Sequence, residues 1–266
     1  LNTKENRDLL ASRAGLERAM MRGSIIEGVA TVCDGEMRLQ VDLGCMRGII
    51  APEEAVFCRP GEVRKDIAVV SRVGKPVAVR ILSFTERHGE MIAVLSRRAA
   101  QKAFLSYCLE ERKPGDIIPG KVTHLEPFGA FLDIGCGVAS LLSVDCISVS
   151  RIPHPRDRLS VGMMLPVAIK SLDRESGRIS VTLRELLGTW AENAAAFAPG
   201  QTVTGIVRSV ESYGAFIELA PNLAGLSEVR GEEQFTLMRS LIGHAVAVYI
   251  KSINPERMKI KLAVVD

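Results

Sequence analysis

Two pairs of aromatic side chains recur at the same spacing and could stack on flat ligands. Phe128 and Phe131 flank a Gly-Ala dipeptide, and Tyr213 and Phe216 flank the same dipeptide. The bases of single-stranded nucleic acid are unpaired, and stacking one on an aromatic ring contributes about 1–3 kcal/mol. The alternative is that one ring of each pair fills a hydrophobic core. Because aromatic residues make up only 5% of the chain, two matched pairs indicate a recurring surface feature.

Basic side chains accompany both pairs and could neutralise phosphate groups. Lys121 starts the strand before the first pair, and Arg178 and Lys259 take matching places before a later strand. The segment 151–158 lies around two prolines, which restrict its conformations and lower the cost of ordering it on binding. We expect it to supply phosphate contacts from Arg151, His154 and Arg156. The alternative is that each of these cations lies on a solvent-exposed face of the protein and binds no phosphate.

The sequence lacks the residue patterns that an enzyme or a metal site needs. It has no Walker-type glycine loop, no H-E-x-x-H and no G-x-S-x-G. Its six cysteines form no C-x-x-C motif, and its four histidines have no metal-ligand spacing to them. We therefore expect no catalytic activity, no metal and no cofactor, and we expect the cysteines to be buried free thiols.

The distribution of charge and hydrophobicity bounds the location and the mode of binding. The first 22 residues are charged throughout, and no run of about 18 apolar residues occurs, so we expect a cytoplasmic protein without a membrane span. The net charge is only +3. Binding of a polyanion would therefore depend on local patches and stacking, not on a strong overall field.

A long internal repeat contains both aromatic pairs. Residues 115–142 match residues 200–227 without a gap, 85 positions later, and residues 162–173 match 243–254. One more copy, which is divergent, lies upstream between residues 24 and 95 and is the first of the three along the chain. A repeat of this kind predicts the domain boundaries before any single motif is interpreted.

Within each copy the strand pattern is short and alternating. About five strands in about 70 residues favour a small antiparallel barrel over a sandwich. Gly129 and Gly214 fall inside a strand pattern, which indicates either a bulge or a close backbone approach. Between the copies the apolar residues follow a helical period over 98–112 and 184–197, and residues 9–21 show the same period. We expect these helices to pack on the adjacent barrels.

The repeated residues resemble the S-one RNA-binding repeat, an OB-fold module named after the largest protein of the bacterial small ribosomal subunit. The similarity covers nearly everything outside the helical linkers and is most specific in the second and third copies. It is carried in the second copy by Gly120-x-Val122, Phe128-Gly-Ala-Phe131, Asp133-Ile-Gly135 and Arg178-Ile-Ser-Val-Thr-Leu183, and in the third by Gly205-x-Val207, Tyr213-Gly-Ala-Phe216 and Lys259-Ile260.

The resemblance implies an all-β chain of three tandem five-stranded antiparallel OB-fold barrels joined by short α-helical linkers. The predicted organisation is an N-terminal helix over 1–22, a degenerate first repeat over 23–97, a helical linker over 98–113, a second repeat over 114–183, a helical linker over 184–198 and a third repeat over 199–266.

The resemblance also implies a face that binds single-stranded RNA through two aromatics, a histidine and a polar pair near the last strand. In the second copy these positions are Phe128, Phe131, Ser143, Asp173 and Arg178. In the third copy they are Tyr213, Phe216, Glu228, Asn254 and Lys259. The histidine is thus replaced in both copies, and Glu228 would repel phosphate. In the first copy the positions are Met37, Gln40, Thr85 and about Met91, so that copy has lost its stacking platform.

Two functions remain open from the sequence. The first is a non-catalytic protein that binds single-stranded RNA, in particular mRNA, in association with the small ribosomal subunit during translation. The second is a protein-interaction scaffold, or an accessory factor of RNA decay or transcription that contacts RNA-processing proteins.

Overall fold

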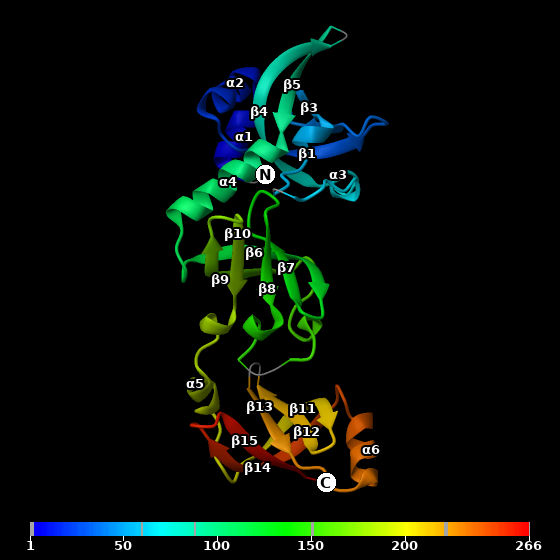
Figure 1. Ribbon diagram of the computed structural model, residues 1–266, viewed down its shortest axis with the longest axis vertical. Helices are drawn as coiled ribbons and strands as arrows, with labels where there is room; N and C mark the ends of the chain where they lie inside the picture. Colours follow the sequence, from blue (N-terminus) through cyan, green and yellow to red (C-terminus); the bar gives the residue numbers. More distant parts are fainter. Residues whose placement is uncertain (1–2, 60, 88, 150–151, 221–222, 266) are drawn as a thin grey trace. The chain divides into compact units, whose positions relative to one another are not determined.

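The strands fold into three closed barrels of five strands each (Figure 1). The computed structural model describes residues 3–59, 61–87, 89–149, 152–220 and 223–265. The predicted all-β chain of three five-stranded barrels with short helices between them is confirmed. One pairing in each barrel, between its third and last strands, runs parallel. This parallel pair closes the barrel.

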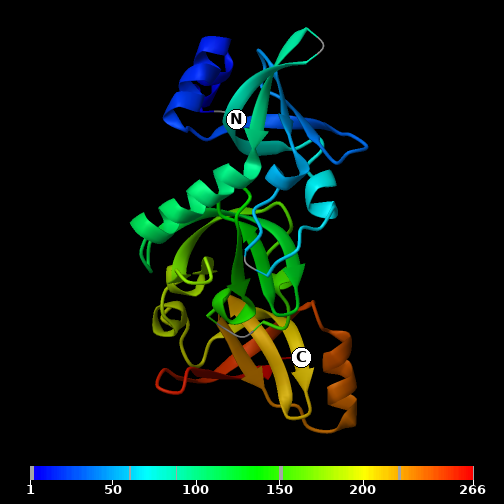
Figure 2. The ribbon, with the colours of Figure 1, turned by 45° about the horizontal axis from the view of Figure 1, so that its top comes forward.

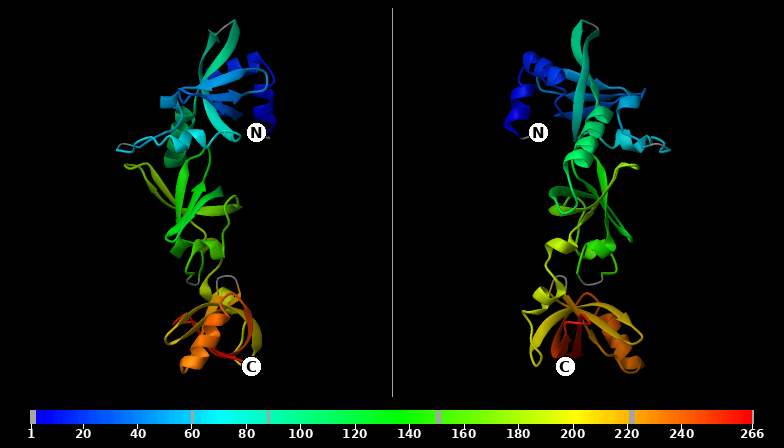
Figure 3. Two further views of the ribbon diagram at one scale, coloured as in Figure 1. Left: turned by 90° about the vertical axis from the view of Figure 1, so that its right-hand side faces the viewer. Right: turned by 60° about the vertical axis from the view of Figure 1, so that its left-hand side comes forward.

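The first barrel has the strand order β1-β2-β3-β5-β4. Its strands are β1 (Ile26–Cys33), β2 (Leu39–Asp42), β3 (Arg47–Ile50), β4 (Pro76–Arg87) and β5 (Glu90–Ser96), with η1 (Pro52–Glu54) and α3 (Ile67–Val70) between β3 and β4. The long β4–β5 hairpin extends beyond the other strands of this barrel (Figure 3).

Two short helices precede this barrel where one helix over residues 9–21 was expected. They are α1 (Lys4–Leu10) and α2 (Arg13–Arg22). The chain breaks at Ser12, whose hydroxyl accepts a hydrogen bond from the Gly15 amide at 3.2 Å and so caps α2. Leu9 and Leu16 join the hydrophobic core of the barrel. The expectation that this helical segment packs on its barrel is therefore confirmed.

The second barrel follows α4 (Arg97–Glu111), which lies where the sequence predicts a helix. Its strands are β6 (Ile117–Glu126), β7 (Gly129–Asp133), β8 (Ala139–Ser143), β9 (Met164–Asp173) and β10 (Arg178–Thr182), with η2 (Val144–Cys146) and η3 (Pro155–Asp157) between β8 and β9. The third barrel has β11 (Thr202–Glu211), β12 (Gly214–Ala220), β13 (Leu223–Ser227), β14 (Ala245–Asn254) and β15 (Lys259–Val264).

The prediction of a continuous helix over 184–197 is wrong. Gly188 has a φ of +80° and separates η4 (Arg184–Leu186) from the short helix α5 (Trp190–Ala194). Thr189 and Glu192 form a capping box that starts α5. Trp190, the single tryptophan of the chain, packs into the core of the third barrel. A helix that the sequence did not predict, α6 (Glu232–Ser240), lies against the same barrel beside β11 (Figure 2).

By packing, the chain divides into two compact units that cut across the second repeat. The first unit contains Leu1–Lys113, Asp133–Ala139 and Leu172–Arg178, and the second contains Pro114–Leu132, Ser140–Ser171 and Ile179–Asp266. No helix among the described residues is long and apolar enough to cross a membrane.

All six cysteines fall within the described residues and are free thiols. Cys108 and Cys146 are buried as expected, whereas Cys45 is exposed in the turn between β2 and β3, which the sequence did not predict. Cys136 is half-buried, and this burial raises the pKa of its thiol to about 11. The Cys136 thiol is therefore protonated at neutral pH.

One glycine position recurs in the first strand of every barrel because no side chain fits there. A Cβ at Gly28 would lie 2.6 Å from the carbonyl oxygen of Asp42, and one at Gly120 would lie 2.7 Å from Leu132 Cδ2. At Gly205 it would lie 2.5 Å from Ile217 Cγ2. At this point the first strand lies too close to the second for a side chain to fit, so the repeated glycine is a steric requirement.

We predict that Gly28→Ala destabilises the first barrel by about 1–3 kcal/mol, because the added methyl group overpacks a filled interior. Gly35→Ala is the matched control, since a Cβ there meets no atom within 4 Å. Hydrogen exchange of the β1 and β2 amides measures the change within this barrel. Equal protection in the two variants would contradict the steric argument.

Candidate nucleic-acid interface

The second barrel presents its aromatic pair in an edge-to-face arrangement. The ring centroids of Phe128 and Phe131 are 6.1 Å apart, and the ring planes meet at 88°. Phe131 lies half-buried on β7, while Phe128 lies in the turn before β7 with 55% of its surface exposed. The inner ring therefore supports the outer ring, whose face stays open to a ligand.

The third barrel repeats this arrangement. Tyr213 and Phe216 have centroids 6.2 Å apart and planes at 88°. Tyr213 is 59% exposed in the turn before β12, and Phe216 is half-buried on β12. Edge-to-face contacts contribute about 0.5–1.5 kcal/mol beyond burial, which is enough to hold the outer ring in place.

A close backbone approach positions both pairs. A Cβ at Gly129 would lie 2.5 Å from the Leu142 carbonyl oxygen, and one at Gly214 would lie 2.6 Å from that of Ser227. Of the two alternatives that the sequence left open at these glycines, the close approach therefore holds. The register shifts of the third barrel lie elsewhere, between Val207 and Ser209 of β11, between Glu218 and Ala220 of β12, and between Ile250 and Ser252 of β14.

In the second barrel, His124 extends the aromatic surface. Its ring centroid lies 6.4 Å from that of Phe131, with the planes inclined by 31°. Its Nε2 lies 2.6 Å from Oε1 of Glu126. The sequence analysis assigned His124 no functional role. The sequence could have indicated its contact with Glu126, because the two-residue period of β6 places residues 124 and 126 on one face of the strand.

Four of the predicted phosphate-contacting side chains are exposed, whereas His154 is half-buried. Lys121 lies on β6, Arg178 starts β10, Lys259 starts β15, and all three side chains face solvent. Arg156 is also exposed, whereas Arg151 lies outside the described residues. Residue 206 of the third barrel, which matches Lys121, is isoleucine, so this cation is not repeated.

Asp173 and Asn254 build the turns between the last two strands of their barrels. Asp173 Oδ1 accepts hydrogen bonds from the amides of Glu175 at 3.0 Å and Ser176 at 3.1 Å. The Ser176 hydroxyl also donates to this carboxylate, and that bond holds the pKa of Asp173 below its ordinary value. Asn254 Oδ1 accepts from the Arg257 amide at 2.9 Å. Both side chains thus have a structural role, and their contact with RNA stays a prediction.

The other sequence-predicted polar positions also have local roles. His154 Nδ1 accepts a hydrogen bond from the Arg156 amide at 3.0 Å and so begins η3. Ser143 is half-buried at the end of β8. At the matching position, Glu228 Oε2 lies 3.3 Å from an exposed Arg230 nitrogen, which offsets part of its repulsion of phosphate.

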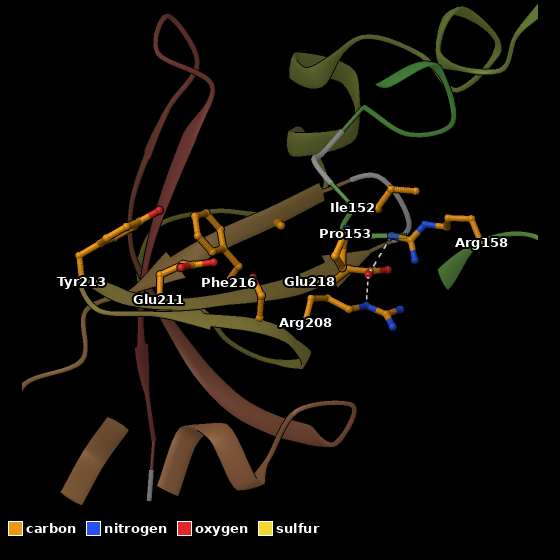
Figure 4. Close-up of a pocket in the computed structure, with 10 residues that line it drawn as sticks. Ile152, Pro153, Arg158, Arg208, Glu211, Tyr213, Phe216 and Glu218 are labelled. Atoms are coloured by element: carbon orange, nitrogen blue, oxygen red, sulfur yellow. Dashed lines mark hydrogen bonds and ion pairs between the residues drawn. The ribbon is translucent and has the colours of Figure 1, made fainter. Parts of the chain in front are cut away.

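A buried ion cluster lies beside the second aromatic pair, and the sequence analysis did not predict it. Glu218 Oε2 accepts a hydrogen bond from Arg208 Nε at 2.5 Å and lies 2.8 Å from Arg158 Nη2 (Figure 4). Glu218 is only 8% exposed. Arg208 is the extra residue of the β11 bulge, and a bulge redirects a side chain in a way that an alternating pattern does not reveal.

The first barrel carries ion pairs where the other barrels carry rings. Gln40 pairs with Val32 across β1 and β2, just as Phe216 pairs with Ser209 in the third barrel. Gln40 therefore takes the position of the inner ring. Beside it, Arg38 Nε lies 2.8 Å from Asp34 Oδ2 and holds the pKa of that carboxylate below its ordinary value. Thr85 pairs with Ile92, so the counterpart of Arg178 and Lys259 is Ile92, one residue beyond the predicted Met91.

Comparison with known proteins finds a family match and several relatives. Residues 111–184 match the family described as the S1 RNA binding domain. Small ribosomal subunit protein bS1 of Staphylococcus aureus is 32% identical over 200 residues, which cover 72% of this chain and 50% of that protein. Its counterpart in Leuconostoc lactis is 32% identical over 198 residues, 71% of this chain and 46% of that protein. The chain thus spans about half the length of these relatives.

Among solved structures, GSP13 from Bacillus subtilis is 25% identical and aligns with a TM-score of 0.27, covering 32% of this chain and 72% of that one. The closed barrels and the family match define an S1-domain protein. The chain is related to small ribosomal subunit protein bS1 and contains three OB-like sheets.

We predict that Glu218→Gln lowers the stability of the third barrel by about 3–5 kcal/mol, because it leaves two arginines without their shared counter-ion in a poorly solvated position. Glu228→Gln is the control, since its exposed partner Arg230 gives a pair worth about 0–1 kcal/mol. Urea denaturation followed by tryptophan fluorescence measures the third barrel through Trp190. If the two variants unfold at the same urea concentration, the cluster does not stabilise the barrel.

Proposed function

We propose that this protein binds single-stranded RNA without catalysis, through the second and third barrels. The observation that carries the proposal is the presence of two matching aromatic pairs in edge-to-face contact. Their ring centroids lie 6.1 Å and 6.2 Å apart, and the outer ring of each pair is more than half exposed. A protein gains nothing in folding from exposing such a ring, whereas an unpaired base gains about 1–3 kcal/mol by stacking on it.

The electrostatics of the two barrels favour a ligand with both bases and phosphates. Lys121, Arg178 and Lys259 are exposed on barrels that also carry the rings. Contacts from such cations release counter-ions from the RNA backbone, so affinity falls as salt concentration rises. The stacking contribution does not depend on charge. Binding should therefore weaken in high salt without being lost entirely.

The relatives suggest where this RNA binding takes place. Both matched relatives are small ribosomal subunit proteins. We therefore propose that the RNA is mRNA and that the protein acts in the cytoplasm, in association with the small ribosomal subunit. The described residues contain no cluster of three or more His, Cys, Asp or Glu side chains that could hold a metal ion. The proposed function requires neither a metal nor another cofactor.

A protein-interaction role is the second candidate, and the first barrel favours it. Its face carries Arg38 with Asp34 and Glu36, and Arg47 with Glu90, in place of aromatic rings. Such a face suits a polar protein surface better than stacked bases. A pull-down from lysate treated with ribonuclease separates the two functions, because partners of a scaffold persist and partners bridged by RNA do not.

We predict that replacing Phe128 and Tyr213 together with alanine lowers the affinity for single-stranded RNA by at least about 30-fold, because these are the open rings and each stack contributes about 1–3 kcal/mol. Fluorescence anisotropy with a labelled oligouridylate measures the affinity. Tyr107→Ala is the matched control, because Tyr107 is 47% exposed but lies on the helix α4 and belongs to neither aromatic pair. An unchanged affinity in the folded double variant would refute the proposed binding surface.

A further inference from the structure

We propose that the third barrel selects guanine in RNA and that Glu211 determines this choice. The inference rests on the proposed binding of single-stranded RNA and adds base selectivity to it. It starts from a pocket next to the Tyr213 and Phe216 rings (Figure 4). The sequence analysis did not predict this pocket.

The pocket has a volume of about 150 Å³ and combines apolar walls with charged ends. Its apolar lining comes from both rings and from Ile152, Pro153 and Ala224. Its polar lining comes from Arg158, Arg208, Ser209, Glu211 and Glu218. All of these residues belong to the second compact unit. A pocket that combines aromatic and apolar walls with a few polar groups is the environment in which proteins read a single unstacked base.

The two ends of the pocket have opposite charge. Glu211 lies on the same side as Tyr213 and Phe216, while Arg158, Arg208 and Glu218 lie at the other end (Figure 4). At that end two guanidinium groups share one carboxylate, which leaves one excess positive charge. A ligand that fits the pocket therefore needs hydrogen-bond donors toward Glu211 and acceptors toward the arginines.

Guanine has this arrangement of donors and acceptors. Its N1–H and N2–H groups lie side by side, and an ionised carboxylate can accept hydrogen bonds from both. Its O6 and N7 atoms are the acceptors that arginine most often recognises. Adenine, cytosine and uracil each place an acceptor beside the donor on their pairing edge. That acceptor would face the Glu211 carboxylate and repel it.

Glu211 is available for such a contact, whereas its counterpart in the second barrel is not. The matching carboxylate, Glu126, lies 2.6 Å from the ring nitrogen of His124. In the third barrel that histidine is replaced by Ser209, and Glu211 is exposed. Arg208 is likewise replaced in the second barrel by Thr123, whose hydroxyl donates to the Phe131 carbonyl at 3.0 Å. We therefore expect guanine selectivity from the third barrel and not from the second.

The experiment uses the full chain and an oligouridylate of about 12 nucleotides, with one central nucleotide changed to G, A or C. Affinities are measured by fluorescence anisotropy. The G-containing RNA should bind roughly five-fold or more tightly than the other three, as expected for one base read by paired hydrogen bonds. In Glu211→Gln the G-containing RNA should lose this advantage over the other three.

Glu233→Gln is the control, because it removes an equal charge from the exposed first turn of α6, outside the pocket, and should keep the preference. If the oligouridylate binds but guanine gives no advantage, base selectivity is wrong and RNA binding stands. If the preference survives in Glu211→Gln, Glu211 is not the selecting residue. If no RNA binds, both proposals fail.

Discussion

The architecture depends on one steric constraint, the close approach of the first strand to the second in each barrel. Gly28, Gly120 and Gly205 meet it in the same way, because a methyl group at any of them would overlap a neighbouring atom. In each barrel the third and last strands pair in parallel, and this pairing closes the barrel. In the second and third barrels, the turn before the second strand places an aromatic residue outside the barrel and its partner against the wall.

On this common frame the three barrels differ in their surface chemistry. The first carries interlocked arginines and carboxylates, the second an imidazole beside its rings, and the third a buried ion cluster with an open carboxylate nearby. Few of these differences touch the core, because the outward positions of a strand vary without disturbing closure. A repeat can thus keep one fold while each copy recognises a different ligand.

The sequence predicted those features that follow from local chemistry. The strand pattern, the recurring glycines and the paired rings lie where alternation and spacing placed them. The break at Gly188 was missed because the apolar spacing continued across it, although a glycine so close to a threonine cap is a stop signal. The Arg158–Glu218–Arg208 cluster could not be predicted, since it joins distant segments through a bulge that shifts the alternation.

The position of Trp190 gives the molecule an internal optical probe. As the single tryptophan, buried on α5 in the core of the third barrel, it reports on that barrel and is silent about the other two. Circular dichroism averages over all three. A difference between the two signals during unfolding would show directly whether the repeats melt together or one after another, without any label being introduced.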